Sequence, residues 1–176
     1  PSMPTIFDTN EEVEEHWYVG KQNISYDINE DQILTFDMFG DSWKIARYRY
    51  GGLWQDYRLA TRIKITETSY DFEDLLIRFR ENDESYYGLG IKVGDDSNDG
   101  FIGLRLEIDG IFLGYFSTAV VDLELNRWYD ITVDIEGDTF TVYIGGEQVL
   151  QGNDSRLARG TISFLSPPDA KVQITN

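Results

Sequence analysis

The stretch from Tyr129 to Ile144 has the sequence YDITVDIEGDTFTVYI. Apolar and polar side chains alternate through both halves, and Glu136-Gly137-Asp138 interrupts the alternation in the middle. A period of two places the apolar side chains on one face of a strand. A glycine-containing turn between two such runs indicates a β-hairpin. The stretch therefore predicts two antiparallel strands that share one buried face.

The same period occurs along most of the chain. Further strands are expected at 24–28, 32–39, 43–50, 57–65, 75–81, 86–93, 102–108, 111–117, 148–151, 160–165 and 171–175. Only the acidic segment 10–15 favours a helical turn. About a dozen short strands with one apolar face each are typical of stacked sheets. We therefore expect an all-β fold, a two-sheet antiparallel β-sandwich.

Length and composition restrict the class of protein. A chain of 176 residues suits one domain, here 1–176. The absence of cysteine excludes a disulfide framework, cysteine-ligated zinc, iron–sulfur clusters and thiol catalysis. A net charge of −17 makes nucleic acid and anionic membrane surfaces poor partners. No apolar run approaches the roughly 20 residues of a membrane span.

The first residues, Pro1-Ser2-Met3-Pro4, do not resemble a signal peptide. We expect them to be a cloning remnant or a disordered start. On this interpretation the domain has been cut from a longer protein, which we expect to be extracellular or exposed at the cell surface.

Several motifs occur in an order that resembles the concanavalin-A-like, or laminin-G-like, jelly-roll superfamily. They are Phe7-Asp8 with Trp17, Trp54-Gln55-Asp56-Tyr57-Arg58-Leu59, Ile77-Arg78-Phe79-Arg80, Tyr86-Tyr87, Asn126–Val133 and Phe140–Gly146. The resemblance covers nearly the whole chain and implies a jelly roll. The superfamily contains lectins, carbohydrate-binding modules, glycoside hydrolases and adhesion domains, so function has to be argued from the site.

Three functions remain open. The first is non-catalytic, lectin-like carbohydrate binding, with a glycan or polysaccharide as partner. The second is a laminin-G-type interaction or adhesion domain with a protein partner. The third is an enzyme domain acting on glycosides. Glycan binding without hydrolysis favours the first, and capture of a protein without a glycan signal favours the second.

Arginine and aromatic side chains form the candidate ligand-binding set. Rings stack on the apolar faces of sugars, and guanidinium groups pair with hydroxyls or carboxylates. Because apolar neighbours must face inward, we expect the four arginines of the set to point outward on adjacent strands. Salt-bridge ladders to neighbouring acids are the structural alternative. The set comprises Tyr48, Tyr50, Trp54, Arg58, Arg62, Arg78, Arg80 and Tyr86, and Trp43 or Trp54 is expected to provide an exposed stacking ring.

No catalytic residue is predicted. Laminarinase-like hydrolases of this fold carry Glu-x-Asp-x-x-Glu on one strand, and Glu107-Ile108-Asp109 supplies only the first two carboxylates. A glycosidase needs a pair of carboxylates on either side of the scissile bond. His16 is the only histidine, and no Gly-x-Ser-x-Gly elbow accompanies it.

Two structural calcium sites are considered. Asp95, Ser97 and Asp99 alternate before Gly100, as in the first half of a calcium loop. The glutamate expected at the twelfth loop position is missing, because Leu106 stands there, and a solvated hairpin loop is the alternative. The family resemblance implies a second site between Asp8 and Asp169.

Overall fold

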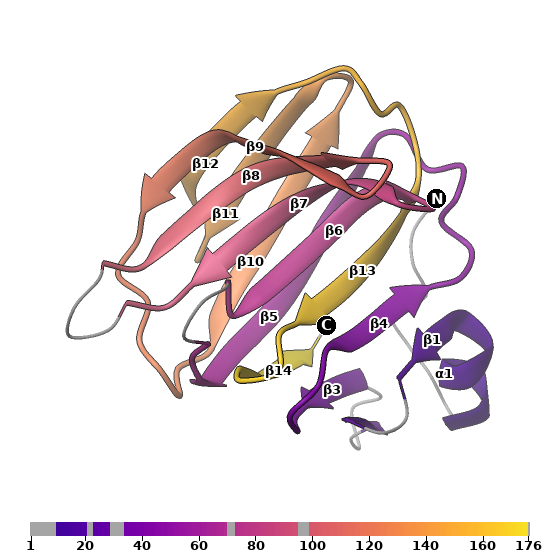
Figure 1. Ribbon diagram of the computed structural model, residues 1–176, viewed down its shortest axis with the longest axis vertical. Helices are drawn as coiled ribbons and strands as arrows, with labels where there is room; N and C mark the ends of the chain where they lie inside the picture. The colour runs from indigo at the N-terminus through magenta and orange to yellow at the C-terminus, as the bar shows by residue number, and fades with distance from the viewer. Residues whose placement is uncertain (1–9, 21–22, 29–33, 70–72, 95–98, 176) are drawn as a thin grey trace.

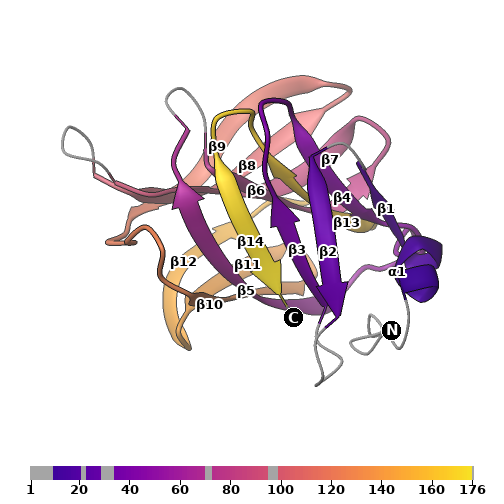
Figure 2. The ribbon, with the colours of Figure 1, turned by 90° about the horizontal axis from the view of Figure 1, so that it is seen from below.

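The computed structural model describes residues 10–20, 23–28, 34–69, 73–94 and 99–175. Its strands form two seven-stranded antiparallel sheets that pack face to face, as the views in Figures 1 and 2 show. The predicted two-sheet sandwich is therefore confirmed.

The sheet nearer the viewer in Figure 1 is called the front sheet. In spatial order it contains β1 (Trp17–Val19), β4 (Lys44–Tyr48), β13 (Thr161–Ser166), β6 (Leu75–Asn82), β7 (Ser85–Lys92), β8 (Phe101–Ile108) and β9 (Ile111–Val120). The back sheet contains β12 (Glu147–Asn153), β11 (Thr139–Ile144), β10 (Tyr129–Glu136), β5 (Tyr57–Glu67), β14 (Lys171–Thr175), β3 (Leu34–Met38) and β2 (Ile24–Ile28). The last two strands, β13 and β14, each enter the middle of a sheet.

The hairpin from Tyr129 to Ile144 forms as predicted. Strands β10 and β11 pair from Ile131↔Ile144 to Glu136↔Thr139. Gly137 has a φ of +53°, which glycine adopts at little cost in a tight turn. The inward side chains Val133, Phe140 and Val142 are completely buried.

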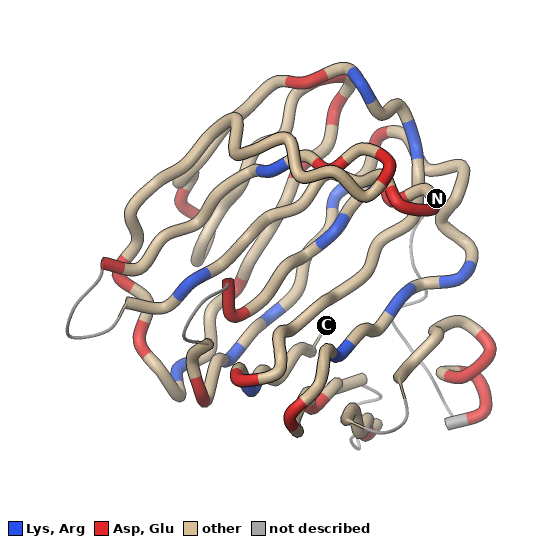
Figure 3. The backbone as a smooth tube through the Cα atoms, viewed as in Figure 1, with Lys and Arg blue, Asp and Glu red and all other residues tan. Residues whose placement is uncertain are grey.

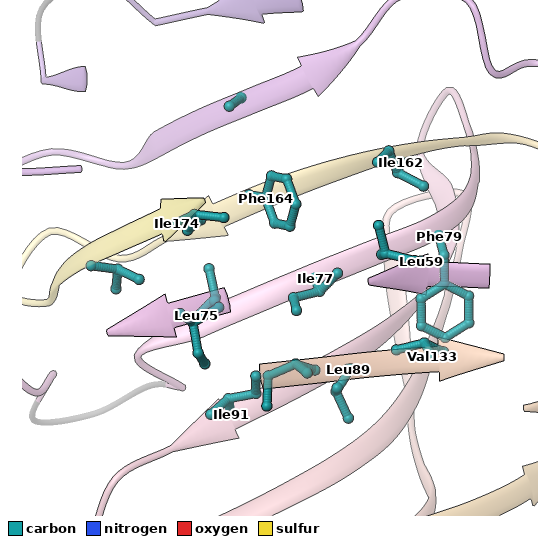
Figure 4. Packing of buried hydrophobic residues seen from close by; sticks show 14 of the residues in the cluster. Leu59, Leu75, Ile77, Phe79, Leu89, Ile91, Val133, Ile162, Phe164 and Ile174 are labelled. Carbon is teal, nitrogen blue, oxygen red and sulfur yellow. The ribbon is translucent and has the colours of Figure 1, made fainter. Parts of the chain in front are cut away.

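The core lies between the two sheets and is built from the apolar half of each alternation. In Figure 4, side chains of β6 and β7 lie close to those of the back-sheet strands β5 and β10. The labelled residues of these four strands are Leu75, Ile77, Phe79, Leu89, Ile91, Leu59 and Val133. All are at most 2% exposed. Burial of so many large apolar side chains is the main stabilising contribution to the fold.

One short helix, α1 (Asn10–His16), precedes β1. The helical turn predicted at 10–15 is therefore present and ends one residue later. The three-residue β1 was not predicted, because a segment this short does not establish a period.

Strand β6 has a bulge near its end. Its pairing with β7 shifts between Phe79 and Asn82, and Arg80 has a φ of +48°. A non-glycine residue with positive φ is uncommon, and a bulge changes the face to which the following side chain points. The alternation that holds through Arg78 therefore fails at Arg80.

The acidic side chains are not spread evenly. Figure 3 shows red segments mainly on α1, at turns and at strand ends, whereas blue segments occur within strands of the front sheet.

Among the residues that the structure describes, no helix is long and apolar enough to cross a membrane.

Candidate functional site

Strand register brings polar side chains into a row across the outer face of the front sheet. Adjacent Cα partners place Arg47 of β4 beside Ser163 of β13, and Ser163 beside Arg78 of β6. The row continues through Gly88 of β7 to Arg105 of β8. Two arginines thus lie on either side of a glycine that has no side chain to fill the space between them.

A groove of about 410 Å³ occupies this part of the sheet. Its lining combines apolar and charged side chains from five segments. They are Trp43, Glu73, Leu76, Arg78, Tyr86, Arg105, Glu107, Leu165 and Pro167. A side chain at Gly88 would crowd the groove, because an added Cβ would lie 2.6 Å from Leu76 Cδ1 and 3.3 Å from Arg105 Cγ.

Arg105 joins two carboxylates in the groove. Its Nη1 donates to Glu73 Oε1 at 2.9 Å, and its Nη2 donates to Glu107 Oε2 at 3.1 Å. Burial alone would lower the pKa of Arg105, but Glu73 raises it above the ordinary arginine value. The guanidinium is therefore held as a fixed cation between two fixed anions.

Each of these carboxylates also accepts a hydrogen bond from a tyrosine. Tyr86 Oη donates to Glu107 Oε2 at 2.5 Å, and Tyr115 Oη donates to Glu73 Oε1. Burial, together with the bond to Glu107, raises the pKa of Tyr86 to about 12. Tyr86 thus keeps its proton and continues to donate at neutral pH.

Arg78 lines the groove beside Tyr86. Its guanidinium carbon lies 4.1 Å from the centroid of the Tyr86 ring, a cation–π distance. Its Nη1 donates to Glu81 Oε1 at 3.3 Å, and Arg47 Nη2 donates to the same oxygen at 2.6 Å. Glu81 is buried, so it holds both arginines against the sheet.

Trp43 is the exposed aromatic residue of the groove lining. Its side chain is 52% exposed, and the neighbouring lining residues Leu76, Leu165 and Pro167 add apolar surface. The groove therefore offers a ring surface on one side and oriented polar groups on the other. This combination is common in small-molecule sites.

The structure brings only Arg78 and Tyr86 of the predicted ligand-binding set into this groove. The expectation that Tyr48 and Trp54 are accessible is wrong: they are 4% and 8% exposed and stack at 5.1 Å in the core. Tyr50 is 58% exposed, but its ring packs on His16, outside the groove lining.

Arg58 and Arg62 lie on the opposite face of the molecule. Both belong to β5 of the back sheet, so the prediction that the four arginines occupy adjacent strands is wrong. Arg58 pairs with Asp134 at 2.5 Å, and Arg62 pairs with Asp130 at 2.9 Å. Arg58 and Arg62 therefore form cross-strand ion pairs, the structural alternative to a ligand-binding role.

Arg80 does not point outward either, because the bulge turns it inward. It is 2% exposed and donates to the backbone carbonyls of Gln55, Gly137 and Leu157. Its guanidinium thus ties together three loops at one end of the sandwich. The prediction of an outward Arg80 is wrong for this reason.

Sequence reasoning did not assign Glu73, Arg105 or Glu107 to a binding site. Arg105 and Glu107 carried a signal, since they alternate with the buried Leu104 and Leu106 on one strand. Glu73 lies just before β6 and carried none. Of the two tryptophans considered for an exposed stacking ring, Trp43 is exposed and Trp54 is buried.

The two acids of the hydrolase-like motif separate in the structure. Glu107 lines the groove, whereas Asp109 stands in the turn before β9 with a φ of +51° and accepts from Ser85 Oγ. His16 is the last residue of α1, and its Nδ1 is 2.9 Å from the Glu12 carbonyl oxygen.

The calcium candidates are only partly described. Asp8, Asp95 and Ser97 lie outside the described residues. Asp99 is exposed and lines a second hollow with Asp122 and Glu124. Within the described part of the chain, no three histidine, aspartate or glutamate side chains form a group that could hold a metal ion.

Asp169 lies near a buried lysine. The Nζ of Lys44 donates to the carbonyl oxygens of Pro167, Pro168 and Ala170 at 2.5, 3.1 and 2.8 Å. Burial lowers the pKa of Lys44, and the charge of Asp169 opposes that shift. The ammonium group of Lys44 thus already places a positive charge near Asp169.

Comparison with known proteins identifies the fold class. No protein-family model and no curated protein matches the sequence. Among solved structures, carbohydrate binding module CBM66 from Bacillus subtilis has a TM-score of 0.70 and 16% identity, over 92% of both chains. The exoplasmic/lumenal domain of VIP36, in a Ca²⁺/Man3GlcNAc-bound form, has a TM-score of 0.63 and 10% identity, over 93% of this chain and 85% of that chain. Bacillus licheniformis beta-glucanase has a TM-score of 0.58 and 9% identity, over 92% and 89%.

These similarities show that the two-sheet sandwich of this chain has the jelly-roll fold of these proteins. The fold that the order of the motifs implied is therefore confirmed. At identities this low the likeness establishes the fold, and the function has to come from the groove.

Proposed function

We propose that the chain is a non-catalytic carbohydrate-binding domain and that the groove on the front sheet is its ligand site. The observation that carries the proposal is the juxtaposition of the exposed Trp43 ring with the interlinked Arg78, Tyr86, Arg105 and Glu107. An aromatic face can stack on the apolar side of a pyranose, while guanidinium and carboxylate groups bond its hydroxyls. A carbohydrate-binding module and a Man3GlcNAc-bound domain are among the similar structures, which supports this assignment.

The groove is suited to binding because its polar groups are already in place. Arg105 is held by Glu73 and Glu107, and Arg78 by Glu81 and the ring of Tyr86. Side chains that are immobilised before the ligand arrives lose little further entropy on binding. We expect such a domain to act outside the cell or at the cell surface.

Replacing Arg78 with alanine tests the site. We expect glycan binding to weaken by about 1–3 kcal/mol, the usual cost of losing a hydrogen bond to a charged group. Binding is measured on a glycan array and then by titration calorimetry with the best ligand. The melting temperature is recorded in parallel, to separate loss of contact from loss of fold.

Arg58→Ala is the matched control, since it removes an arginine from the same kind of strand position on the back sheet. It should leave glycan binding unchanged. A second pair, Trp43→Ala in the groove and Tyr50→Ala outside it, compares two exposed rings in the same way. If Arg58→Ala weakens binding as much as Arg78→Ala does, the ligand site is not this groove.

Two further measurements, made alongside the glycan array, test the other two functions. Release of reducing ends from a bound glycan would make the chain a glycoside-acting enzyme, as the similarity to a beta-glucanase requires us to test. Capture of a protein partner without any glycan signal would favour an adhesion domain of laminin-G type.

Calcium binding is proposed for the 95–99 loop, as a structural site separate from the groove. We expect millimolar calcium to raise the melting temperature relative to EDTA, because an ion that binds only the folded chain stabilises it by mass action. Glycan affinity should be the same in both buffers, since the polar groups of the groove are fixed by one another. An unchanged melting temperature would remove both the loop and the Asp8–Asp169 pair from consideration.

A further inference from the structure

The charged side chains around the groove balance one another. Three arginines, Arg47, Arg78 and Arg105, face three glutamates, Glu73, Glu81 and Glu107, and each arginine pairs with at least one of them at 3.3 Å or less. The groove is thus locally neutral on a chain whose net charge is −17.

The carboxylates of these pairs are held in place. The side chains of Glu81, Glu73 and Glu107 are 1%, 13% and 19% exposed, and the Arg105 side chain is 14% exposed. Tyr86 and Tyr115 add a hydrogen bond to Glu107 and Glu73 respectively. An anionic ligand would have to displace a buried, hydrogen-bonded carboxylate from its arginine, and leaving such a charge without its partner is costly.

The hydrogen-bonding capacity left over is of both kinds. Among the described residues, the buried atoms without a hydrogen-bond partner include the donors Nε of Arg78 and of Arg105, two groove-lining residues. They also include the acceptor Glu81 Oε2, whose residue binds Arg78 but is not part of the groove lining. A hydroxyl group, of a sugar or of bound water, can both donate and accept, whereas the carboxylate that replaces a hydroxymethyl group in a uronate can only accept. The net charge of −17 on the whole chain also opposes the approach of an anion.

From this balance we infer that the groove selects an uncharged, polyhydroxylated sugar and rejects its uronic acid counterpart. The inference rests on the proposed function and adds the ligand class to it. The groove volume of about 410 Å³ lies near the lower end of small-molecule sites and suits one or two sugar rings.

The test compares matched oligosaccharides that differ only in charge. The probes are neutral gluco-, galacto- and manno-oligosaccharides and the corresponding glucuronate, galacturonate and mannuronate oligomers. We expect at least one neutral series to bind, and its uronate counterpart to bind at least about tenfold more weakly, because the uronate can reach an arginine only by displacing its buried carboxylate partner. Affinity for the neutral series should change little with salt concentration.

The Glu107→Gln variant tests whether the charge of Glu107 sets the preference for neutral sugars. The substitution preserves shape but leaves Arg105 with only Glu73 as an anionic partner. We expect the ratio of uronate to neutral affinity to rise by about fivefold or more. Asp134→Asn, which frees Arg58 on the back sheet, is the matched control and should leave the ratio unchanged. Melting temperatures confirm that both variants are folded.

The outcomes separate the inference from the proposed function. Uronates that bind as well as or better than neutral sugars, with an affinity that falls as salt rises, overturn the inference and leave carbohydrate binding in place. Neutral binding with an unchanged ratio in Glu107→Gln also overturns it, because charge balance in the groove would then not set selectivity. Binding of neither series overturns the proposed function and the inference with it.

Discussion

Replacing Arg80 with alanine should lower the free energy of unfolding by about 3–5 kcal/mol, because three part-buried backbone carbonyls lose a charged donor and a hydrogen bond from a charged group contributes about 1.5–3 kcal/mol. Arg80 donates to Gln55 O at 2.9 Å, Leu157 O at 3.0 Å and Gly137 O at 2.6 Å. Its guanidinium carbon also lies 5.4 Å from the centroid of the Phe140 ring in the core. The substitution removes the group that joins three loops and leaves a cavity beside that ring.

Urea denaturation of the wild type and of Arg80→Ala measures the loss directly. Arg58→Ala is again the control, because its ion pair with Asp134 is largely exposed and such pairs contribute little. Arg80→Lys keeps the positive charge but replaces the planar guanidinium with a single ammonium group. The ammonium cannot reach all three carbonyls, so this variant should recover only part of the lost stability. Equal and small effects of Arg80→Ala and Arg58→Ala would contradict a structural role for Arg80.

Lys44→Met is expected to cost about 2–4 kcal/mol of unfolding free energy, since hydrogen bonds from a charged donor contribute about 1.5–3 kcal/mol and this ammonium makes several. The side chain is 1% exposed. Its Nζ joins Gly40 O, at 3.2 Å, to the carbonyls of 167–170. Methionine has a similar size, so the loss comes from the carbonyls and not from a cavity.

The Lys44 substitution should also weaken glycan binding, because Pro167 belongs to the groove wall. Lys171→Met is the matched control: Lys171 pairs with Glu67 on the surface, and its removal should change neither property appreciably. Calorimetric melting of both variants, with and without ligand, gives the comparison. An equal melting temperature for Lys44→Met and the wild type would contradict this prediction, because it would show that the Lys44 ammonium does not stabilise the fold through the carbonyls of Pro167, Pro168 and Ala170.

Much of the fold could be predicted from local pattern. Alternation between Tyr129 and Ile144 predicted β10 and β11, and Gly137 marked their turn. Arg78 faces outward, as its buried neighbours Ile77 and Phe79 required. These inferences succeeded because side-chain period and turn chemistry depend on a few consecutive residues.

The candidate site could be predicted only in part. Arg58 and Arg78 have the same kind of apolar neighbours, yet one lies on the back sheet beside Asp134 and the other in the groove. Arg80 differs from Arg78 through a bulge that the alternation did not reveal. Glu73 lies outside any strand, yet its carboxylate accepts a hydrogen bond from Arg105. The Glu73 side chain passes close to Gly90, where an added Cβ would lie 2.8 Å from Glu73 Cγ.

The sequence by itself determined that this chain forms a sandwich of short strands, with the apolar half of each alternation inside. Only the tertiary structure decided which strands share a sheet, and therefore which arginines, carboxylates and aromatic rings meet in one groove. The row from Arg47 to Arg105 joins five strands and includes β13, which enters from near the end of the chain. Such pairings depend on contacts between distant segments, whereas the period of a strand records only which of its faces is buried.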